Sequence, residues 1–492
     1  MPSMAPAQER NDSLSGADMP AANNGSRVSV VNMASGTSAP IAMSMTATPA
    51  SAPTIGSGIQ SPPVASSSSS SPPSGIQHPA AVPTQQGPAG IRFDFNDGCR
   101  VTLPEGEWRV LLRDAITANP LFETTISAGT VTSSKKYFVP FEIEVWSQDH
   151  TIFHHRLDLA GRAVLVHLPV GTLGDTLGWF PYVAKFERKH RCQLSCVMAA
   201  PLIELFRDAY PSIRFLTPDQ VDPSEYYATY NIGLFFTDEA NVRQPSDFRH
   251  VGLHRTAAYI LGVDPAEARP DIVLPDDSRP IDEPYVCIAT QSTTQSKYWN
   301  NPTGWRELVE FLKAQGYRVI CIDQKATHGS GMVWNHLPYG CEDMTGDRPL
   351  AERARWLKHA AFFVGLSSGL SWLAWAMRVP VVMISGFTHP TNEFDTPYRV
   401  INYHTCNSCW NDVRVQFDHK DFLWCPRHAG TPRQFECTRL ITADQVKHTI
   451  RQIPGFSLAS RAAPSTLSAH EPPHPNEKHD QLDQHDQHEQ AI

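Results

Sequence analysis

Two long stretches of the chain alternate short, continuous apolar runs with amphipathic segments of helical length. In the first, the apolar run AVLVHLPV (163–170) precedes a helical segment from Asp175 to about Arg191. Further segments continue this alternation: LSCVM (194–198), LIELFRDAY (202–210) and NIGLFF (231–236). Such runs are typical of strands buried on both faces, and the segments between them fit the covering helices. Residues 161–275 are therefore predicted to form a Rossmann-like domain.

A Pro-rich connection at 263–284 leads to a second α/β series, which we assign to residues 276–400. Its expected elements alternate in the same way: strand 285–292, helix 305–315, strand 317–323, helix 351–359, strand 361–365, helix 370–377 and strand 379–384. Residues 360–377 carry no charge over nearly the length of a membrane span, but small polar residues interrupt them, so we interpret them as buried strand and helix. Two α/β domains joined by such a linker typically enclose a ligand-binding cleft.

Residues 91–160 have a different pattern, with short alternating apolar stretches separated by turn residues. This predicts a small β-rich domain before the first α/β domain. All 46 aromatic residues lie between Phe93 and Phe456. The Ser/Pro/Ala-rich arm (1–90) and the His-rich tail (457–492) therefore lack the apolar anchors of a core, and we expect both to be disordered. Between the last strand and the tail, 401–440 is expected to be a separate finger and 441–456 a C-terminal helix.

The net charge is −9, of which the His-rich tail carries −4 and the Ser/Pro/Ala-rich arm −1. The middle of the chain is left near −4 and contains no Lys/Arg-rich run. This argues against nucleic acid or a membrane surface as the main partner, while a small anionic ligand remains compatible. The N-terminus has neither a basic start nor an apolar segment of signal-peptide type. A cytoplasmic protein without membrane insertion is expected.

The first candidate for chemistry is the segment GTLGDTLGWFP (171–181), where a predicted strand meets a helix. Ligands bind at such carboxyl ends of strands, so Asp175 could act as a general base, with Thr172 and Gly174 beside the substrate. The competing interpretation is that Asp175 is a helix N-terminal acid that only caps backbone amides.

The second candidate is the turn before the helix 370–377. Free amides at a helix start attract anions, and serine hydroxyls add donors, which suits a diphosphate. The residues assigned to this anion cradle are Ser367, Ser368, Gly369 and Ser371. A tight turn from strand to helix also needs small residues for purely steric reasons.

Two further loops follow predicted strands. In the first, Thr293 and Lys297 could bind phosphate, although a lone lysine in a loop is more often simply solvated. The second follows the strand VVMIS and is positioned to contact a ribose or base, although its residues also form turns. Its candidates are Thr388, His389, Asn392 and Glu393.

Four cysteines fall within 32 residues of the finger: Cys406, Cys409, Cys425 and Cys437. Because a cytoplasmic chain rarely uses disulfides, four thiols at this spacing favour a structural metal site, with zinc and iron both compatible. A site closed by four thiolates leaves no open position for a catalytic water. The other six cysteines are scattered through predicted core elements and are interpreted as buried apolar residues.

With these motifs in view, residues 91–456 resemble the bacterial autotransporter heptosyltransferases, which are cytoplasmic glycosyltransferases related to the lipopolysaccharide heptosyltransferases. The likeness rests on GTLGDTLGWFPY, QSTTQSKYWN, GLSSGLSWLAWA and the four-cysteine finger. It implies an α/β GT-B fold: a small β-rich, barrel-like domain, then an acceptor-side and a nucleotide-sugar-binding Rossmann-like domain, and a metal finger. It also implies a homo-oligomer in the form of a dodecameric ring.

The resemblance further implies transfer of heptose from ADP-glycero-manno-heptose to serines of an autotransporter adhesin, with inversion. Asp175 would be the base, Lys297 the phosphate-binding lysine, and the four cysteines would hold one iron per subunit, with zinc as the alternative. Two other functions remain open: a GT-B transferase with another nucleotide sugar, and a non-catalytic nucleotide-binding scaffold for adhesins.

Overall fold

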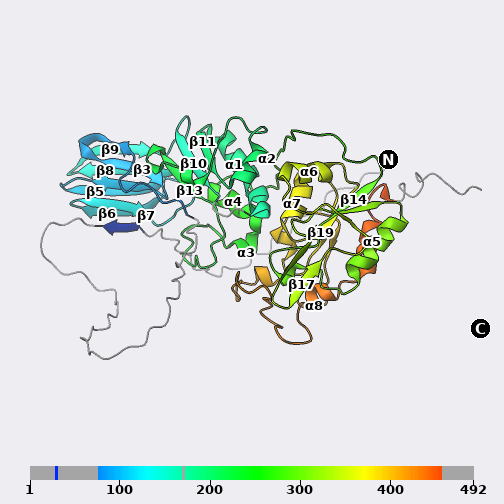
Figure 1. The fold of residues 1–492 in the computed structure, drawn as a ribbon. Helices are drawn as coiled ribbons and strands as arrows, with labels where there is room; N and C mark the ends of the chain where they lie inside the picture. Colours follow the sequence, from blue (N-terminus) through cyan, green and yellow to red (C-terminus); the bar gives the residue numbers. More distant parts are fainter. Residues whose placement is uncertain (1–27, 32–75, 169–171, 457–492) are drawn as a thin grey trace, which may run out of the picture.

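The computed structural model describes residues 28–31, 76–168 and 172–456. A β-rich domain lies at one end of the molecule, the first α/β lobe follows, and the second α/β lobe lies at the other end (Figure 1). Within the described residues, no helix is long and apolar enough to cross a membrane.

The β-rich domain consists of two antiparallel sheets. One contains β1 (Val28–Val31), β7 (Gly129–Ser133), β4 (Arg100–Leu103), β3 (Arg92–Asn96) and β2 (Gln85–Gln86). The other has the order β6 (Pro120–Ile126), β5 (Trp108–Asp114), β8 (Phe141–Ser147), β9 (His150–Arg156). Val101, Val110 and Ile143 from both sheets are fully buried in one core. The described strands pair into open sheets, so the expected barrel-like form is better described as two packed sheets.

The expectation of a disordered arm over 1–90 is wrong for residues 28–31, which form β1, and for residues 76–90. The Thr84 amide donates to Asp94 Oδ2 at 3.0 Å, and Arg100 Nη1 donates to the Ala80 carbonyl at 2.8 Å. Asp94 is itself fully buried and paired with Arg100. This segment is therefore held by polar contacts with its neighbours, which its lack of aromatic residues did not reveal.

The first lobe, here called the N-lobe, has a parallel sheet in the order β12 (Arg214–Leu216), β11 (Gln193–Val197), β10 (Ala163–His167), β13 (Ala228–Asn231). Strand β13 also pairs with β3, so this sheet continues into the β-rich domain. Its helices are α1 (Leu173–His190), α2 (Ala200–Phe206), α3 (Phe248–Val251) and α4 (Leu253–Leu261). The predicted strand at 231–236 is wrong, because the strand is ATYN (228–231) and residues 232–236 form a loop. Residues 169–171, the end of predicted strand 163–170 and the first glycine of the GTLGDTLGWFP motif, lie outside the described residues.

The second lobe, the C-lobe, has a parallel sheet in the order β18 (Glu342–Asp343), β15 (Arg318–Cys321), β14 (Tyr285–Ile288), β19 (Phe363–Leu366), β20 (Val381–Ile384), β21 (Arg399–Val400). In chain order this is 3-2-1-4-5-6, the dinucleotide-fold order, with its switch point between β14 and β19. Its helices are α5 (Gly304–Ala314), α6 (Leu350–Lys358), α7 (Gly369–Ala376) and α9 (Ala443–Ile450). The hairpin of β16 (Thr327–Ser330) and β17 (Val333–His336) was not predicted.

The finger, residues 401–440, is mostly irregular, with a short 3-10 turn at Cys409–Asn411 and helix α8 (Glu436–Arg439). It has a small core of its own, in which Cys409 and Trp424 pack with Phe387 of the C-lobe. The predicted C-terminal helix within 441–456 corresponds to α9, which begins with a capping box at Thr442 and Gln445.

Candidate functional site

The N-termini of α1 and α7 meet where the two lobes touch. A Cβ atom on Gly174 would lie 2.9 Å from Cδ1 of Trp372, and one on Gly369 would lie 2.9 Å from Cβ of Leu173. Larger residues do not fit at these distances, so the glycines permit the close approach. Because α1 follows β10 and α7 follows β19, the approach brings the carboxyl ends of these two strands to one junction.

Asp175 lies in the first turn of α1 and is half-buried. The hydroxyl of Thr172 donates to its carboxylate. Burial raises the pKa of Asp175, while the Thr172 hydrogen bond and the charges of Lys297 and His419 lower it in part. A carboxylate with a raised pKa at a lobe junction has the properties of a general base.

Lys297 comes from the opposite lobe, at the end of the 3-10 turn Gln295–Lys297 that follows β14. Burial lowers the pKa of its ammonium group, while the charges of Asp175 and Glu393 raise it. Asp175 and Lys297 are therefore within electrostatic reach of each other across the lobe junction. Thr294, and not the predicted Thr293, has the buried side chain in this loop.

The expected anion cradle is only partly available. Ser371 is fully buried and its hydroxyl donates to the Leu366 carbonyl at 2.5 Å, so it stabilises the turn. Ser367 is also buried and donates to Glu393 Oε1 at 2.5 Å. Ser368 and Gly369 remain half-exposed and present the start of α7. The assignment of Ser371 as a ligand contact is thus not supported by its surroundings.

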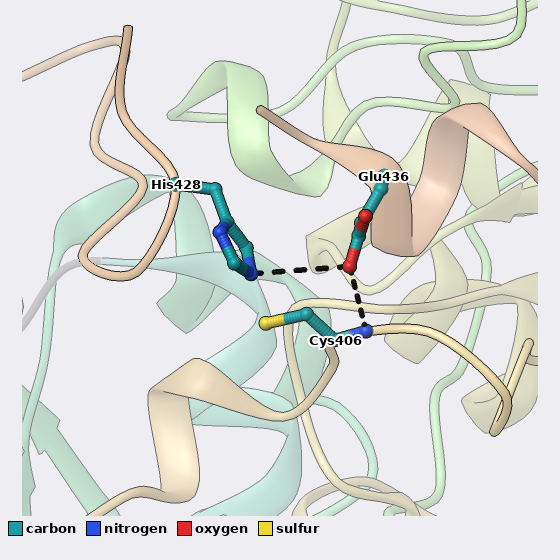
Figure 2. A group of neighbouring side chains, drawn as sticks. All are labelled: Cys406, His428 and Glu436. Atoms are coloured by element: carbon teal, nitrogen blue, oxygen red, sulfur yellow. Dashed lines mark hydrogen bonds and ion pairs between the residues drawn. The ribbon is translucent and has the colours of Figure 1, made fainter. Parts of the chain in front are cut away.

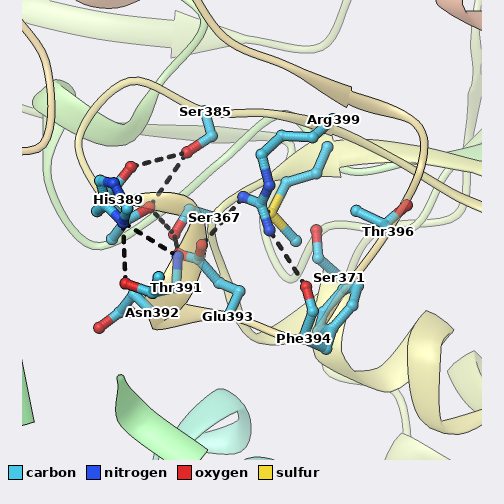
Figure 3. Close-up of polar contacts among 12 residues, drawn as sticks. Ser367, Ser371, Ser385, His389, Thr391, Asn392, Glu393, Phe394, Thr396 and Arg399 are labelled. Carbon is cyan, nitrogen blue, oxygen red and sulfur yellow. Dashed lines mark hydrogen bonds and ion pairs between the residues drawn. The ribbon is translucent and has the colours of Figure 1, made fainter. Parts of the chain in front are cut away.

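The loop 388–393 lies beside the cradle and is hydrogen-bonded to it through Ser367 (Figure 3). Thr388 Oγ1 donates to Ser367 Oγ at 3.0 Å, and Glu393 Oε2 accepts from Arg399 at 3.0 Å. Asn392 is buried and accepts from the Trp410 indole at 3.2 Å. His389 is exposed, with its Nδ1 accepting from the Thr391 amide. The network connects the cradle to the finger. Arg399 forms the ion pair that balances the charge of the buried Glu393, and no sequence signal pointed to this residue beyond its position after β20.

All four predicted metal-ligating cysteines line one small cavity of about 20 Å³ in the finger. Burial raises the pKa of Cys409 and of Cys437 to about 12 in each case, and the charges of the neighbouring cysteines act in the same direction. Thiols that disfavour each other's ionisation fit a site in which a cation balances thiolates.

Two residues that the sequence did not point to share this cavity. The potential ligand atoms of Cys406, His428 and Glu436 lie within 4.8 Å of one another, and Figure 2 shows them converging from separate segments. Glu436 Oε1 accepts from the Cys406 amide at 3.1 Å and also pairs with Arg433. This tight group contains only one of the four cysteines.

His419 and Trp410 were also missed. His419 lies in the finger, and its charge lowers the pKa of Asp175. The Trp410 ring centroid lies 5.7 Å from Lys297 Nζ. Nothing in the spacing of the finger residues predicts that its segments reach the lobe junction.

Comparison with known proteins places this geometry in a family. Residues 87–149 match the model of the N-terminal domain of glycosyltransferase TibC, and residues 260–416 match glycosyltransferase family 9 (heptosyltransferase). The autotransporter heptosyltransferase BAHTCr of Citrobacter rodentium is 57% identical over 379 residues, which cover 76% of this chain and 92% of that protein. The autotransporter heptosyltransferase TibC of Escherichia coli is 55% identical over 393 residues, covering 79% of this chain and 96% of TibC.

The chain belongs to the autotransporter heptosyltransferase family. This confirms the predicted family, the GT-B-like α/β fold with a β-rich N-terminal domain, and the glycosyltransferase class. A crystal structure of TibC, described as a dodecameric iron-containing heptosyltransferase in complex with ADP-D-β-D-heptose, has a TM-score of 0.74 and covers 77% of this chain and 99% of its own.

The family also contains a member named as inactive. BimC of Burkholderia thailandensis is 55% identical over 383 residues, covering 78% of this chain and 90% of BimC. Overall similarity within this family is therefore not enough to decide whether a member is active. Whether this chain is active has to be judged from the residues at its lobe junction.

Proposed function

We propose that this autotransporter heptosyltransferase transfers heptose from an ADP-heptose donor to serine hydroxyls of an autotransporter adhesin. The relationship between Asp175 and Lys297 across the lobe junction carries the proposal. One group suits a proton acceptor and the other suits a diphosphate, and a hydroxyl attacking a nucleotide sugar needs both.

In the proposed reaction, Asp175 takes the proton from the serine hydroxyl as its oxygen attacks the anomeric carbon. The bond from that carbon to the diphosphate oxygen breaks on the opposite side, so the configuration inverts and ADP leaves. Lys297 and the half-exposed start of α7 at Ser368 and Gly369 stabilise the charge on the departing diphosphate. Thr293 and the loop 388–393 are proposed to lie beside the donor.

The finger is proposed to hold one metal ion through Cys406, Cys409, Cys425 and Cys437. Iron is favoured over zinc because TibC is described as iron-containing. The metal would cross-link segments of the finger that are otherwise irregular, a structural contribution of the kind seen in small metal-dependent domains.

Because the chain is related to TibC, we propose that it also forms a dodecamer. We further propose that it works in the cytoplasm, where its donor and its unexported acceptor would meet. TibC is described as dodecameric.

Co-expression with a candidate adhesin tests the central proposal. Intact-mass measurement should show the adhesin heavier by whole heptose units when the wild-type enzyme is present, and unmodified when Asp175→Asn replaces it. A panel of nucleotide sugars, scored by the mass added, would expose a different donor.

The second candidate is a non-catalytic adhesin-binding protein. The relative BimC, which is named as inactive, favours keeping this alternative. This alternative predicts a stable complex with the adhesin and ADP binding, with no added mass for any donor in the panel.

A further inference from the structure

Trp410 joins three parts of the molecule. Its ring packs against Phe236 and Phe248 of the N-lobe, at centroid distances of 5.6 and 6.0 Å. Its indole nitrogen donates to Asn392 in the C-lobe loop at 3.2 Å. The residue itself belongs to the finger, one position after Cys409. Through this one residue, the finger therefore contacts both lobes at the junction.

The ammonium of Lys297 lies over a pair of aromatic rings. Its Nζ is 5.3 Å from the ring centroid of Phe387 and 5.7 Å from that of Trp410, and these two rings are 5.6 Å apart. Both distances are within the range at which a cation is attracted to a ring face. Phe417 packs against both rings, at 5.3 Å from Trp410 and 5.6 Å from Phe387.

This arrangement has a consequence for the charge of Lys297. In the part of the chain that the structure describes, no carboxylate oxygen lies within 4.0 Å of its Nζ in an ion pair. A close carboxylate would neutralise the ammonium and compete with a diphosphate. Ring faces attract a cation without placing a competing negative charge beside it, so the ammonium of Lys297 is not already paired with a close carboxylate when an anion arrives.

The backbone of the Lys297 loop is also held by the finger. The carbonyl of Phe422 accepts hydrogen bonds from Thr294 Oγ1 and from the Gln295 amide, each at 2.9 Å. Both donors precede Lys297 in the same turn. The finger therefore fixes both the start of the loop and the end of the lysine side chain.

We propose that Trp410 is a positioning residue of the donor site, which holds the Lys297 ammonium against its ring and aims it at the diphosphate. The finger is then a wall of the active site as well as a metal-binding segment. The proposal rests on the phosphate-binding role proposed above for Lys297.

A double-mutant cycle on the full-length protein tests this, with ADP affinity measured by calorimetry. Trp410→Leu should weaken ADP binding about 3- to 30-fold, the range expected for a lost cation–ring contact. Trp410→Phe, which keeps a ring face, should recover most of the loss. In a Lys297→Met background, where there is no ammonium to position, Trp410→Leu should change ADP affinity less than twofold.

Phe417→Leu is the matched control, because it removes a ring from the same cluster while leaving both rings under the ammonium. Any effect it has on ADP affinity should be the same in the wild-type background and in the Lys297→Met background. An equal loss for Trp410→Leu in both backgrounds would overturn the positioning role and leave a packing role. Unchanged ADP affinity in Lys297→Met alone would instead overturn the proposed function of Lys297, so the two failures are distinguishable.

Discussion

The hydroxyl of Thr172 donates a hydrogen bond to the carboxylate of Asp175 three residues later in the chain. Thr172 is the N-cap of α1, yet its side chain does not bond to the backbone amides of that helix. The helix start thus gives up a common stabilising contact, and the hydroxyl stabilises the ionised form of the candidate base instead.

Replacement of Thr172 by Val should move the pH dependence of transfer. The hydrogen bond lowers the pKa of Asp175 against the effect of burial, so its loss should raise that pKa further. The base would then be protonated over a wider range, and the acidic limb of the kcat/KM profile should shift upward by about one pH unit, as expected for a hydrogen bond to a charged group. A profile identical to that of the wild type would show that Asp175 does not limit the rate at acidic pH.

Replacement of Asp175 by Asn should separate catalysis from binding. Loss of a general base costs about 10²- to 10⁴-fold in rate, and the change should appear in kcat while ADP affinity stays close to that of the wild type. Single-turnover transfer to a purified adhesin, followed by mass, measures the first effect and calorimetry the second. Retention of full transfer activity would remove Asp175 from the mechanism.

The same Asp175→Asn variant should be at least as stable as the wild type at neutral pH. Because burial raises the pKa of Asp175 in the folded state, the folded protein binds that proton more tightly than the unfolded chain does. The wild type is therefore destabilised as pH rises from the ordinary pKa of an Asp side chain through its raised pKa in the folded state. The Asn variant has no charge to bury and escapes this loss of stability. Thermal unfolding should give the variant an equal or higher Tm at pH 8, with the difference shrinking as pH falls toward 4. A lower Tm for the variant at pH 8 would contradict burial of this charge.

Sequence patterns predicted the framework of this site well. The apolar runs located β10, β14, β19 and β20 to within a few residues, because parallel strands buried on both faces leave a strong local signal. Asp175 and Lys297 could be singled out because each follows such a strand, and residues at carboxyl strand ends in both lobes meet at the junction.

The rest depended on contacts that have no local signature. Ser371 is of a residue type that often binds anions at a helix start, yet its hydroxyl donates its hydrogen bond to the carbonyl of Leu366. Trp410 reaches Lys297 from more than 100 positions away, out of a segment with little regular structure. The partner of a polar or aromatic side chain is set by tertiary packing, and a single sequence does not encode it in any periodicity.

Replacement of Gly174 by Ala should disturb the contact between the lobes. Its Cβ would lie 2.9 Å from Cδ1 of Trp372, a buried ring with little freedom to move, and such overpacking typically costs about 1–3 kcal/mol. Both Tm and transfer activity should fall. Gly87→Ala is the control, because its Cβ would meet Phe153 at an ordinary 3.4 Å in the β-rich domain. Equal behaviour of the two variants would show that the α1–α7 contact is not tight in solution.

Replacement of Cys406 by Ser should release metal from the finger, and His428→Gln decides the ligand set. If the four thiols hold the ion, elemental analysis should find about one metal per subunit in the wild type and in His428→Gln, and less than half of that in Cys406→Ser. Cys196→Ala, at a fully buried position in β11, controls for the loss of a thiol as such and should keep its metal. Because metal binding stabilises the segments it joins, Tm should fall in Cys406→Ser alone of the two finger variants.

Loss of metal in His428→Gln would instead place that imidazole among the ligands, as its 4.8 Å grouping with Cys406 and Glu436 allows. Full metal content in Cys406→Ser would exclude Cys406 as a ligand and with it the four-thiol site.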